Sequence, residues 1–326
     1  MNPVLQSLPV VVLLPHSRCN CRCLMCDIWK DTNSRSLSLS DLDRLLDDFQ
    51  KLRVKWVVLS GGEPLMHPHL FEFCSKLRER GIQITLLSTG LLFARYSAAI
   101  VENVSDAIVS LDGPPAVHDR IRRVPGAYNS LAHGVTEIHK LRSGFPISAR
   151  STVQRDNYRF LNETAWTAKN LGLQSVSFLA ADVASEAFNR PLGWSGERQS
   201  EIALTIDDLR GLECEIEALI SEWAESGFVV ENPDKLRRIL LHYRAHLGLE
   251  QPTAPQCNAP WTSAVVESDG TVRPCFFHRP IGTMGGSRLL NVLNGPEAVD
   301  FRSHLDVASN PICQRCVCSL NWKTAA

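Results

Sequence analysis

The cysteines of this chain fall into two dense groups near its two ends. Four of them crowd one short segment, at Cys19, Cys21, Cys23 and Cys26. Five more lie in the last quarter of the chain, at Cys257, Cys275, Cys313, Cys316 and Cys318. Cys74 and Cys214 stand alone, and Cys74 fits a buried position in a helix. Cysteines that serve as small buried hydrophobes would not gather in this way, so the pattern indicates two metal sites.

The first group offers three thiolates at the spacing Cys19-x3-Cys23-x2-Cys26. A closed structural zinc or iron site takes four protein ligands. Three thiolates on a four-iron cluster leave one iron open to a further ligand, which suits a reactive centre. A zinc site is the alternative, with His16 as its fourth ligand.

Alternating strand and helix patterns must position this loop. Short apolar runs predict six strands, at 10–14, 56–59, 82–87, 107–111, 147–153 and 175–179. Amphipathic patterns predict the helices between them, the first starting at a capping box on Ser38 and the others at 70–80, 91–101, 130–141 and 161–171. This alternation indicates a parallel sheet with right-handed crossovers, whose functional residues gather at the carboxyl ends of the strands.

Polar and glycine motifs stand at those strand ends. They are Gly61-Gly62-Glu63-Pro64, Ser88-Thr89-Gly90, and Ser110-Leu111-Asp112-Gly113 followed by His118-Asp119 and Arg122. With the cysteine spacing, these motifs resemble the radical S-adenosylmethionine (SAM) superfamily. The resemblance implies an α/β fold, a partial (β/α)6 barrel, in which Cys19, Cys23 and Cys26 hold a [4Fe–4S] cluster and Cys21 is a bystander.

The same resemblance implies a reaction and a binding site. SAM would chelate the open iron through its amino and carboxylate groups, and an electron from the cluster would cleave it to a 5′-deoxyadenosyl radical that abstracts hydrogen from a substrate. Glu63 would accept a hydrogen bond from the SAM ammonium group. The residues implied to bind SAM are Gly61, Gly62, Glu63, Ser88, Thr89, Ser110 and Asp112.

The second cysteine group follows the pattern Cys257-x12-Gly270-x4-Cys275, then Cys313-x2-Cys316. The alternating segment 264–272 contains Asp269-Gly270, which predicts a hairpin that brings Cys257 and Cys275 to one end of a ribbon. The pattern resembles the twitch domain, a shortened form of the SPASM domain. The resemblance implies an auxiliary [4Fe–4S] cluster on Cys257, Cys275, Cys313 and Cys316, with Cys318 as a possible substitute ligand. A zinc knuckle is the alternative.

Composition excludes several classes of function. Lys+Arg 34 and Asp+Glu 35 leave a net charge of −1, so the sequence shows no basic stripe for nucleic acid or for an anionic membrane. The early apolar run 10–14 is far shorter than the roughly 20 residues of a membrane helix. Without a visible secretory signal, the expected location is the cytoplasm, where thiols stay reduced.

The sequence thus predicts a barrel at 1–185, a helical connecting segment at 186–250 and a twitch-like domain at 251–326. The expected function is a radical SAM oxidation or dehydrogenation of a small metabolite or peptide, with an external electron donor such as flavodoxin or ferredoxin. Peptide epimerisation or crosslinking and a zinc-stabilised binding protein without chemistry are the alternatives. Arg190 and Trp194 are candidate substrate contacts, and Cys214 is a conceivable thiol hydrogen donor.

Overall fold

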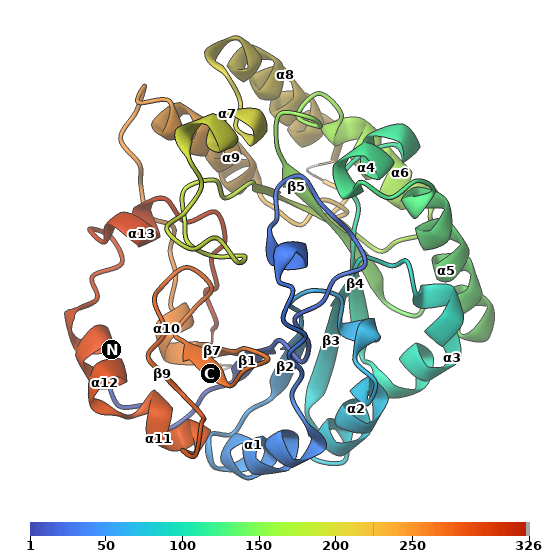
Figure 1. Cartoon of the computed structure of the whole chain (residues 1–326). Helices are drawn as coiled ribbons and strands as arrows, with labels where there is room; N and C mark the ends of the chain where they lie inside the picture. Colours follow the sequence, from blue (N-terminus) through green and yellow to red (C-terminus); the bar gives the residue numbers. More distant parts are fainter. Residues whose placement is uncertain (224, 324–326) are drawn as a thin grey trace.

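A curved parallel sheet forms the centre of the computed structural model, which describes residues 1–223 and 225–323 (Figure 1). Its first six strands are β1 (Val10–Leu13), β2 (Trp56–Leu59), β3 (Gln83–Ser88), β4 (Asp106–Ser110), β5 (Ile147–Val153) and β6 (Val176–Ala180). All neighbouring pairs among these six are parallel, in the order β6-β5-β4-β3-β2-β1. The six predicted strands and the partial barrel are therefore confirmed.

Helices cover the outer face of this sheet (Figure 1). They are α1 (Leu39–Lys51), α2 (Leu70–Arg78), α3 (Phe93–Asn103), α4 (Pro115–Arg122), α5 (Ala127–Leu141) and α6 (Leu161–Asn170). Strand residues alternate between the two faces. Val11 and Leu13 are fully buried under the helices, whereas Val12 is half-buried on the inner face. The predicted capping box on Ser38 starts α1.

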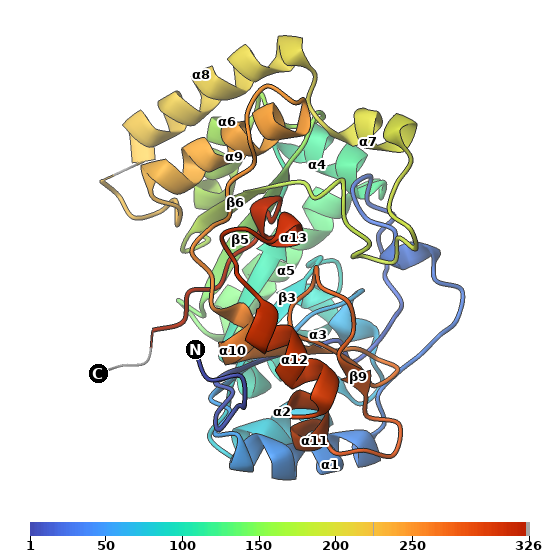
Figure 2. The ribbon, with the colours of Figure 1, turned by 90° about the vertical axis from the view of Figure 1, so that its left-hand side faces the viewer.

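The connecting segment closes the far edge of the barrel. It contains α7 (Gly196–Ile202), α8 (Ile206–Trp223) and α9 (Pro233–His246). Figure 2 shows α8 and α9 side by side, and α9 also contacts β6. The hydroxyl of Tyr243 on α9 donates to the carbonyl oxygen of Val153 at 2.6 Å, which ties α9 to the carboxyl end of β5.

The C-terminal segment extends the same sheet at its other edge. It contains α10 (Ala259–Thr262), β7 (Ser263–Val266), β8 (Thr271–Arg273), β9 (Gly282–Thr283), α11 (Leu289–Leu293), α12 (Pro296–His304) and α13 (Pro311–Gln314). Strand β7 pairs parallel with β1, and β8 pairs antiparallel with β7. The predicted hairpin is confirmed, with Gly270 in the left-handed region at φ +84.

Length and apolar character together decide whether a helix can cross a bilayer. None of the helices within residues 1–223 and 225–323 meets both requirements.

Candidate functional site

The first cysteine group lies in the loop that leaves the carboxyl end of β1. Cys19 and Cys26 are half-buried, whereas Cys21 and Cys23 are buried. Below the loop, the Oγ1 atom of Thr89 lies 3.0 Å from the Oδ1 atom of Asn20, which connects the loop to the end of β3. The loop that carries Cys19, Cys23 and Cys26 therefore lies at the carboxyl ends of β1 and β3.

The glycine motif after β2 packs directly on this cysteine loop. A Cβ atom added to Gly62 would lie 2.0 Å from the carbonyl oxygen of Arg18, the residue before Cys19. The backbone N–H of Glu63 donates to that same carbonyl at 2.8 Å. Gly61 has φ +106, and its added Cβ would lie 3.0 Å from the Leu14 side chain. The paired glycines are thus required for the close approach of two loops, independently of any ligand.

Gly62→Ala should unfold the site because the methyl group would collide with backbone, which cannot move aside like a side chain. We expect a loss of about 3 kcal/mol in the free energy of unfolding, together with reduced iron incorporation. Gly196→Ala is the matched control, because nothing lies within 4 Å of its added Cβ. That control should change stability by no more than about 0.5 kcal/mol. Thermal melting and iron analysis of both variants test this, and equal behaviour of the two would contradict it.

Glu63 is fully buried and its carboxylate is occupied by neighbouring protein groups. It accepts hydrogen bonds from the Ser88 hydroxyl at 2.9 Å, from the backbone N–H of Thr89 at 2.7 Å and from that of Leu65 at 3.1 Å. Burial raises the pKa of this carboxyl, while the hydrogen bonds act in the opposite direction. The structure therefore brings Glu63, Ser88 and Thr89 into one cluster, in which the Glu63 side chain joins the ends of β2 and β3. Contact of its carboxylate with a SAM ammonium group stays a prediction.

Asp112, beyond the end of β4, is also fully buried. Its Oδ2 atom forms an ion pair with the Nη2 atom of Arg122 at 2.6 Å. The Nη1 atom of the same guanidinium lies 3.4 Å from the Sγ atom of Cys23. A hydrogen bond from the Cys21 thiol, aided by the Arg122 charge, lowers the pKa of Cys23 and favours its thiolate form. Ser110, at the end of β4, is half-buried.

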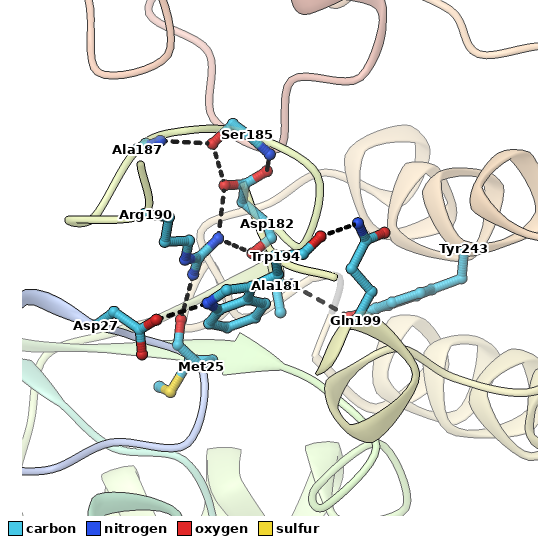
Figure 3. Close-up of polar contacts among 10 residues, drawn as sticks. All are labelled: Met25, Asp27, Ala181, Asp182, Ser185, Ala187, Arg190, Trp194, Gln199 and Tyr243. Carbon is cyan, nitrogen blue, oxygen red and sulfur yellow. Dashed lines mark hydrogen bonds and ion pairs between the residues drawn. The ribbon is translucent and has the colours of Figure 1, made fainter. Parts of the chain in front are cut away.

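The loop after β6 lies over the other side of the cysteine loop (Figure 3). Arg190 donates to the carbonyl oxygen of Met25 at 2.5 Å and to the Asp182 carboxylate at 3.1 Å. The Trp194 indole donates to the Asp27 carboxylate at 2.7 Å and stacks under the Arg190 guanidinium at 3.7 Å. Both side chains are buried and contact the cysteine loop, so they hold it in place, and their contact with a substrate stays a prediction. No local sequence signal joins residues 165 positions apart.

The second cysteine group surrounds a single cavity of about 240 Å³. Its sulfur-bearing lining residues are Cys257, Cys275, Cys313, Cys316 and Cys318. The inner faces of β1 and β2 line the same cavity, through Val12 and Val58 among others. Burial raises the pKa of Cys275 to about 11. The structure therefore places all four predicted auxiliary ligands, and Cys318, against the interior of the barrel.

The donor chemistry of both cysteine groups fits iron–sulfur clusters, because soft thiolates are the protein ligands that such clusters take. A further cavity of about 610 Å³ is lined by Gly61 and Gly62, by Arg190 of the loop after β6 and by Asp269 of the turn between β7 and β8.

The isolated cysteines lie apart from both groups. Cys74 lies within α2 and is buried in the core, as predicted. Cys214 is exposed on α8.

Comparison with protein-family models identifies two regions. Residues 13–153 match the Radical SAM superfamily, and residues 257–317 match SPASM, an iron–sulfur cluster-binding domain. The chain is similar to the AdoMet-dependent heme synthase of Methanosarcina barkeri, at 28% identity over 201 residues that cover 56% of each protein. It is also similar to the Fe-coproporphyrin III synthase of that organism, at 31% identity over 155 residues, 46% of this chain and 38% of the relative. The chain thus spans about half or less of the length of these curated relatives.

Among solved structures, the fold resembles Streptococcus suis SuiB bound to S-adenosylmethionine. The TM-score is 0.70 at 15% identity, over 97% of this chain and 74% of SuiB. SuiB bound to its precursor peptide SuiA gives a TM-score of 0.69 at 14% identity, over 97% of this chain and 72% of SuiB. At this level of identity the likeness concerns the fold.

Proposed function

Because the chain belongs to the radical SAM superfamily and carries an SPASM iron–sulfur domain, we propose that it oxidises a small metabolite by removing a hydrogen atom from it. When bound, the [4Fe–4S] cluster and SAM supply the 5′-deoxyadenosyl radical that carries out this removal. Cys19, Cys23 and Cys26 would hold the cluster, because their spacing is the one that the resemblance to this superfamily implies. An external electron donor, such as flavodoxin or ferredoxin, would supply the electron in the cytoplasm.

The residues around the cysteine loop would position the cofactors and exclude water. Gly61 and Gly62 allow the loop after β2 to approach the cysteine loop, and Glu63 fixes that loop to the end of β3. Arg190 and Trp194 cover the opposite side and keep solvent from it. A closed, dry site protects a reactive radical from side reactions.

The position of the auxiliary cysteines is the observation that supports an oxidation as the reaction. Their cavity is shared with the inner faces of β1 and β2, the surface on which the barrel would hold a substrate. A cluster on Cys257, Cys275, Cys313 and Cys316 would therefore lie beside the substrate. When bound, that cluster would supply a one-electron acceptor, so that a substrate which has given up a hydrogen atom would lose one further electron and one proton in a two-electron oxidation.

The substrate class is proposed from the charges next to that cluster. A cavity of about 690 Å³ adjoins Cys316 and Cys318, and Arg150, Lys235 and Arg238 line it. Glu231 and Asp234 line it as well, so the basic side chains exceed the acidic ones by one, and the guanidinium groups of Arg150 and Arg238 are suited to bind carboxylates of a ligand. The heme-related names of two similar proteins make a carboxylate-bearing tetrapyrrole the first small metabolite to test.

Peptide modification is the second candidate, because the fold resembles SuiB, whose structure with a precursor peptide is known. The same assay separates the two. Reconstituted protein is incubated anaerobically with SAM, dithionite and either Fe-coproporphyrin III or pooled peptides, and 5′-deoxyadenosine and product masses are measured. We expect 5′-deoxyadenosine to rise at least about tenfold above background with the porphyrin, with a product that has lost hydrogen. A rise with peptides alone would favour the second candidate, and a product of unchanged mass would overturn the oxidation.

A further inference from the structure

A buried ion pair lies directly behind the cysteine loop. Arg122 ends α4 and is 7% exposed, while its partner Asp112 is fully buried. One nitrogen of the guanidinium lies 2.6 Å from the Asp112 carboxylate, and another lies 3.4 Å from the sulfur of Cys23. The sequence places these residues in one motif but gives no sign that a cation contacts a cluster cysteine.

The backbone fixes the guanidinium relative to Cys23. The N–H of Arg22 donates to the carbonyl oxygen of Arg122 at 3.2 Å, and the N–H of Leu24 donates to that of Ile121 at 3.0 Å. The end of α4 is therefore attached to the residues on both sides of Cys23. These backbone hydrogen bonds hold the end of α4 beside Cys23, so the Arg122 guanidinium is kept close to the Cys23 sulfur.

Asp112 is also fixed in place, by hydrogen bonds from other parts of the barrel. Its Oδ1 atom accepts the backbone N–H of Thr152 at 3.2 Å, and its carbonyl oxygen accepts the Asn157 side chain at 2.9 Å. Burial and the nearby Arg122 charge lower the pKa of His118 to about 3, so this neighbour adds no positive charge. The local charge therefore consists of one guanidinium and the carboxylate that compensates it.

Stability alone does not explain this pair. Removing two charges from water is costly, and replacing a buried ion pair with well-packed apolar residues is often neutral or stabilising. Beside a cluster, however, hydrogen bonds to the sulfurs and nearby charge set the reduction potential. Reduction adds one electron and hence one negative charge, which a cation in a medium of low dielectric constant stabilises.

We propose that Arg122 and Asp112 act as positioning residues that set the reduction potential of the SAM-binding cluster. Arg122 raises the potential through its contact with Cys23, and Asp112 fixes Arg122 and offsets part of its charge. This proposal rests on the assignment of that cluster to Cys19, Cys23 and Cys26.

The test is a redox titration of the full-length holoenzyme. Anaerobic protein is titrated with dithionite and mediator dyes, and the EPR signal that changes on addition of SAM is followed. Arg122→Gln should make the equilibrium constant for reduction about tenfold smaller, a shift of about 59 mV to more negative potential. Asp112→Asn should shift the potential in the positive direction, because it leaves the guanidinium charge uncompensated. Arg122→Lys, which keeps the charge, should restore most of the wild-type value.

Arg120→Gln is the matched control on the same helix. Arg120 is exposed and pairs with Asp156 at 3.4 Å, so its loss should leave the potential unchanged. Opposite shifts in Arg122→Gln and Asp112→Asn, at unchanged iron content, would not arise from a merely structural role. Shifts of the same sign, or none, would overturn the proposal while leaving the assigned function intact. If Arg122→Gln fails to hold iron, Asp112→Asn still tests the proposal, because this variant keeps Arg122 at Cys23. Its reduction potential should then be higher than that of the wild type. Absence of a SAM-sensitive signal in the wild type would overturn both.

Discussion

The variant in which Cys19, Cys23 and Cys26 are all replaced by alanine should lose half of its iron and all of its SAM cleavage. Two four-iron clusters correspond to about eight irons per chain, and removal of one leaves about four. The auxiliary cysteines are a separate group around their own cavity, so their cluster should survive. Iron and sulfide analysis after anaerobic reconstitution, with chromatography of 5′-deoxyadenosine, measures both effects.

Two single variants sharpen this result. Cys214→Ser is the control, because Cys214 is exposed on α8 and belongs to neither group. Cys21→Ala tests the spacing itself. Cys21 is buried beside Cys23, so a cluster that used it as a ligand would lose iron in this variant, whereas the Cys19, Cys23 and Cys26 assignment predicts retention. Iron that stays at about eight in the triple variant would place the cluster elsewhere, and a wild-type content of about four that falls to none would show that no auxiliary cluster is present.

The strands and both cysteine groups could be predicted because their signals are local. A strand such as β2 is a short apolar run, and metal ligands such as Cys313 and Cys316 are near neighbours in the chain. Helix α4 was missed because it is short and buries His118 and Arg122, which breaks the apolar stripe by which helices are recognised.

The loop after β6 could not be predicted for a different reason. Phe188, Asn189 and Leu192 all adopt positive φ, which non-glycine residues take up only when their surroundings impose it. Here the surroundings are the distant cysteine loop, which Asn189 contacts at the carbonyl oxygen of Asp27, 3.1 Å away. The sequence therefore drew attention to Arg122 and Arg190 but could not predict that both side chains contact the cysteine loop.

The two arginines that contact the cysteine loop share a physical character. Arg122 and Arg190 are both buried and both contact the cysteine loop, one at a sulfur and one at a carbonyl oxygen. Each is paired with a buried aspartate, Asp112 or Asp182. A cluster carried by thiolates is anionic, and cations near it reduce the cost of placing that charge away from water. Buried positive charges therefore lie on both sides of the cysteine loop.

Loss of the auxiliary ligands should separate SAM cleavage from product formation. The double variant Cys275→Ala and Cys313→Ala should fall from about eight to about four irons, because a cluster cannot keep its place on two of its four thiolates. The barrel-mouth site is untouched, so SAM cleavage should persist. Oxidised product should fall at least about a hundredfold, because the second electron has no acceptor beside the substrate.

Comparison of Cys316 with Cys318 tests the ligand set within the same cavity. Both side chains line it, but Cys318 is exposed whereas Cys316 is half-buried and its thiol lies at the Cys318 carbonyl oxygen. Cys316→Ala should therefore lose the auxiliary iron and Cys318→Ala should keep it. The reverse result would make Cys318 the fourth ligand.

If the variant with both Cys275→Ala and Cys313→Ala loses iron yet forms product at the wild-type rate, the cluster serves the structure of the domain, and the substrate's second electron must leave by another route.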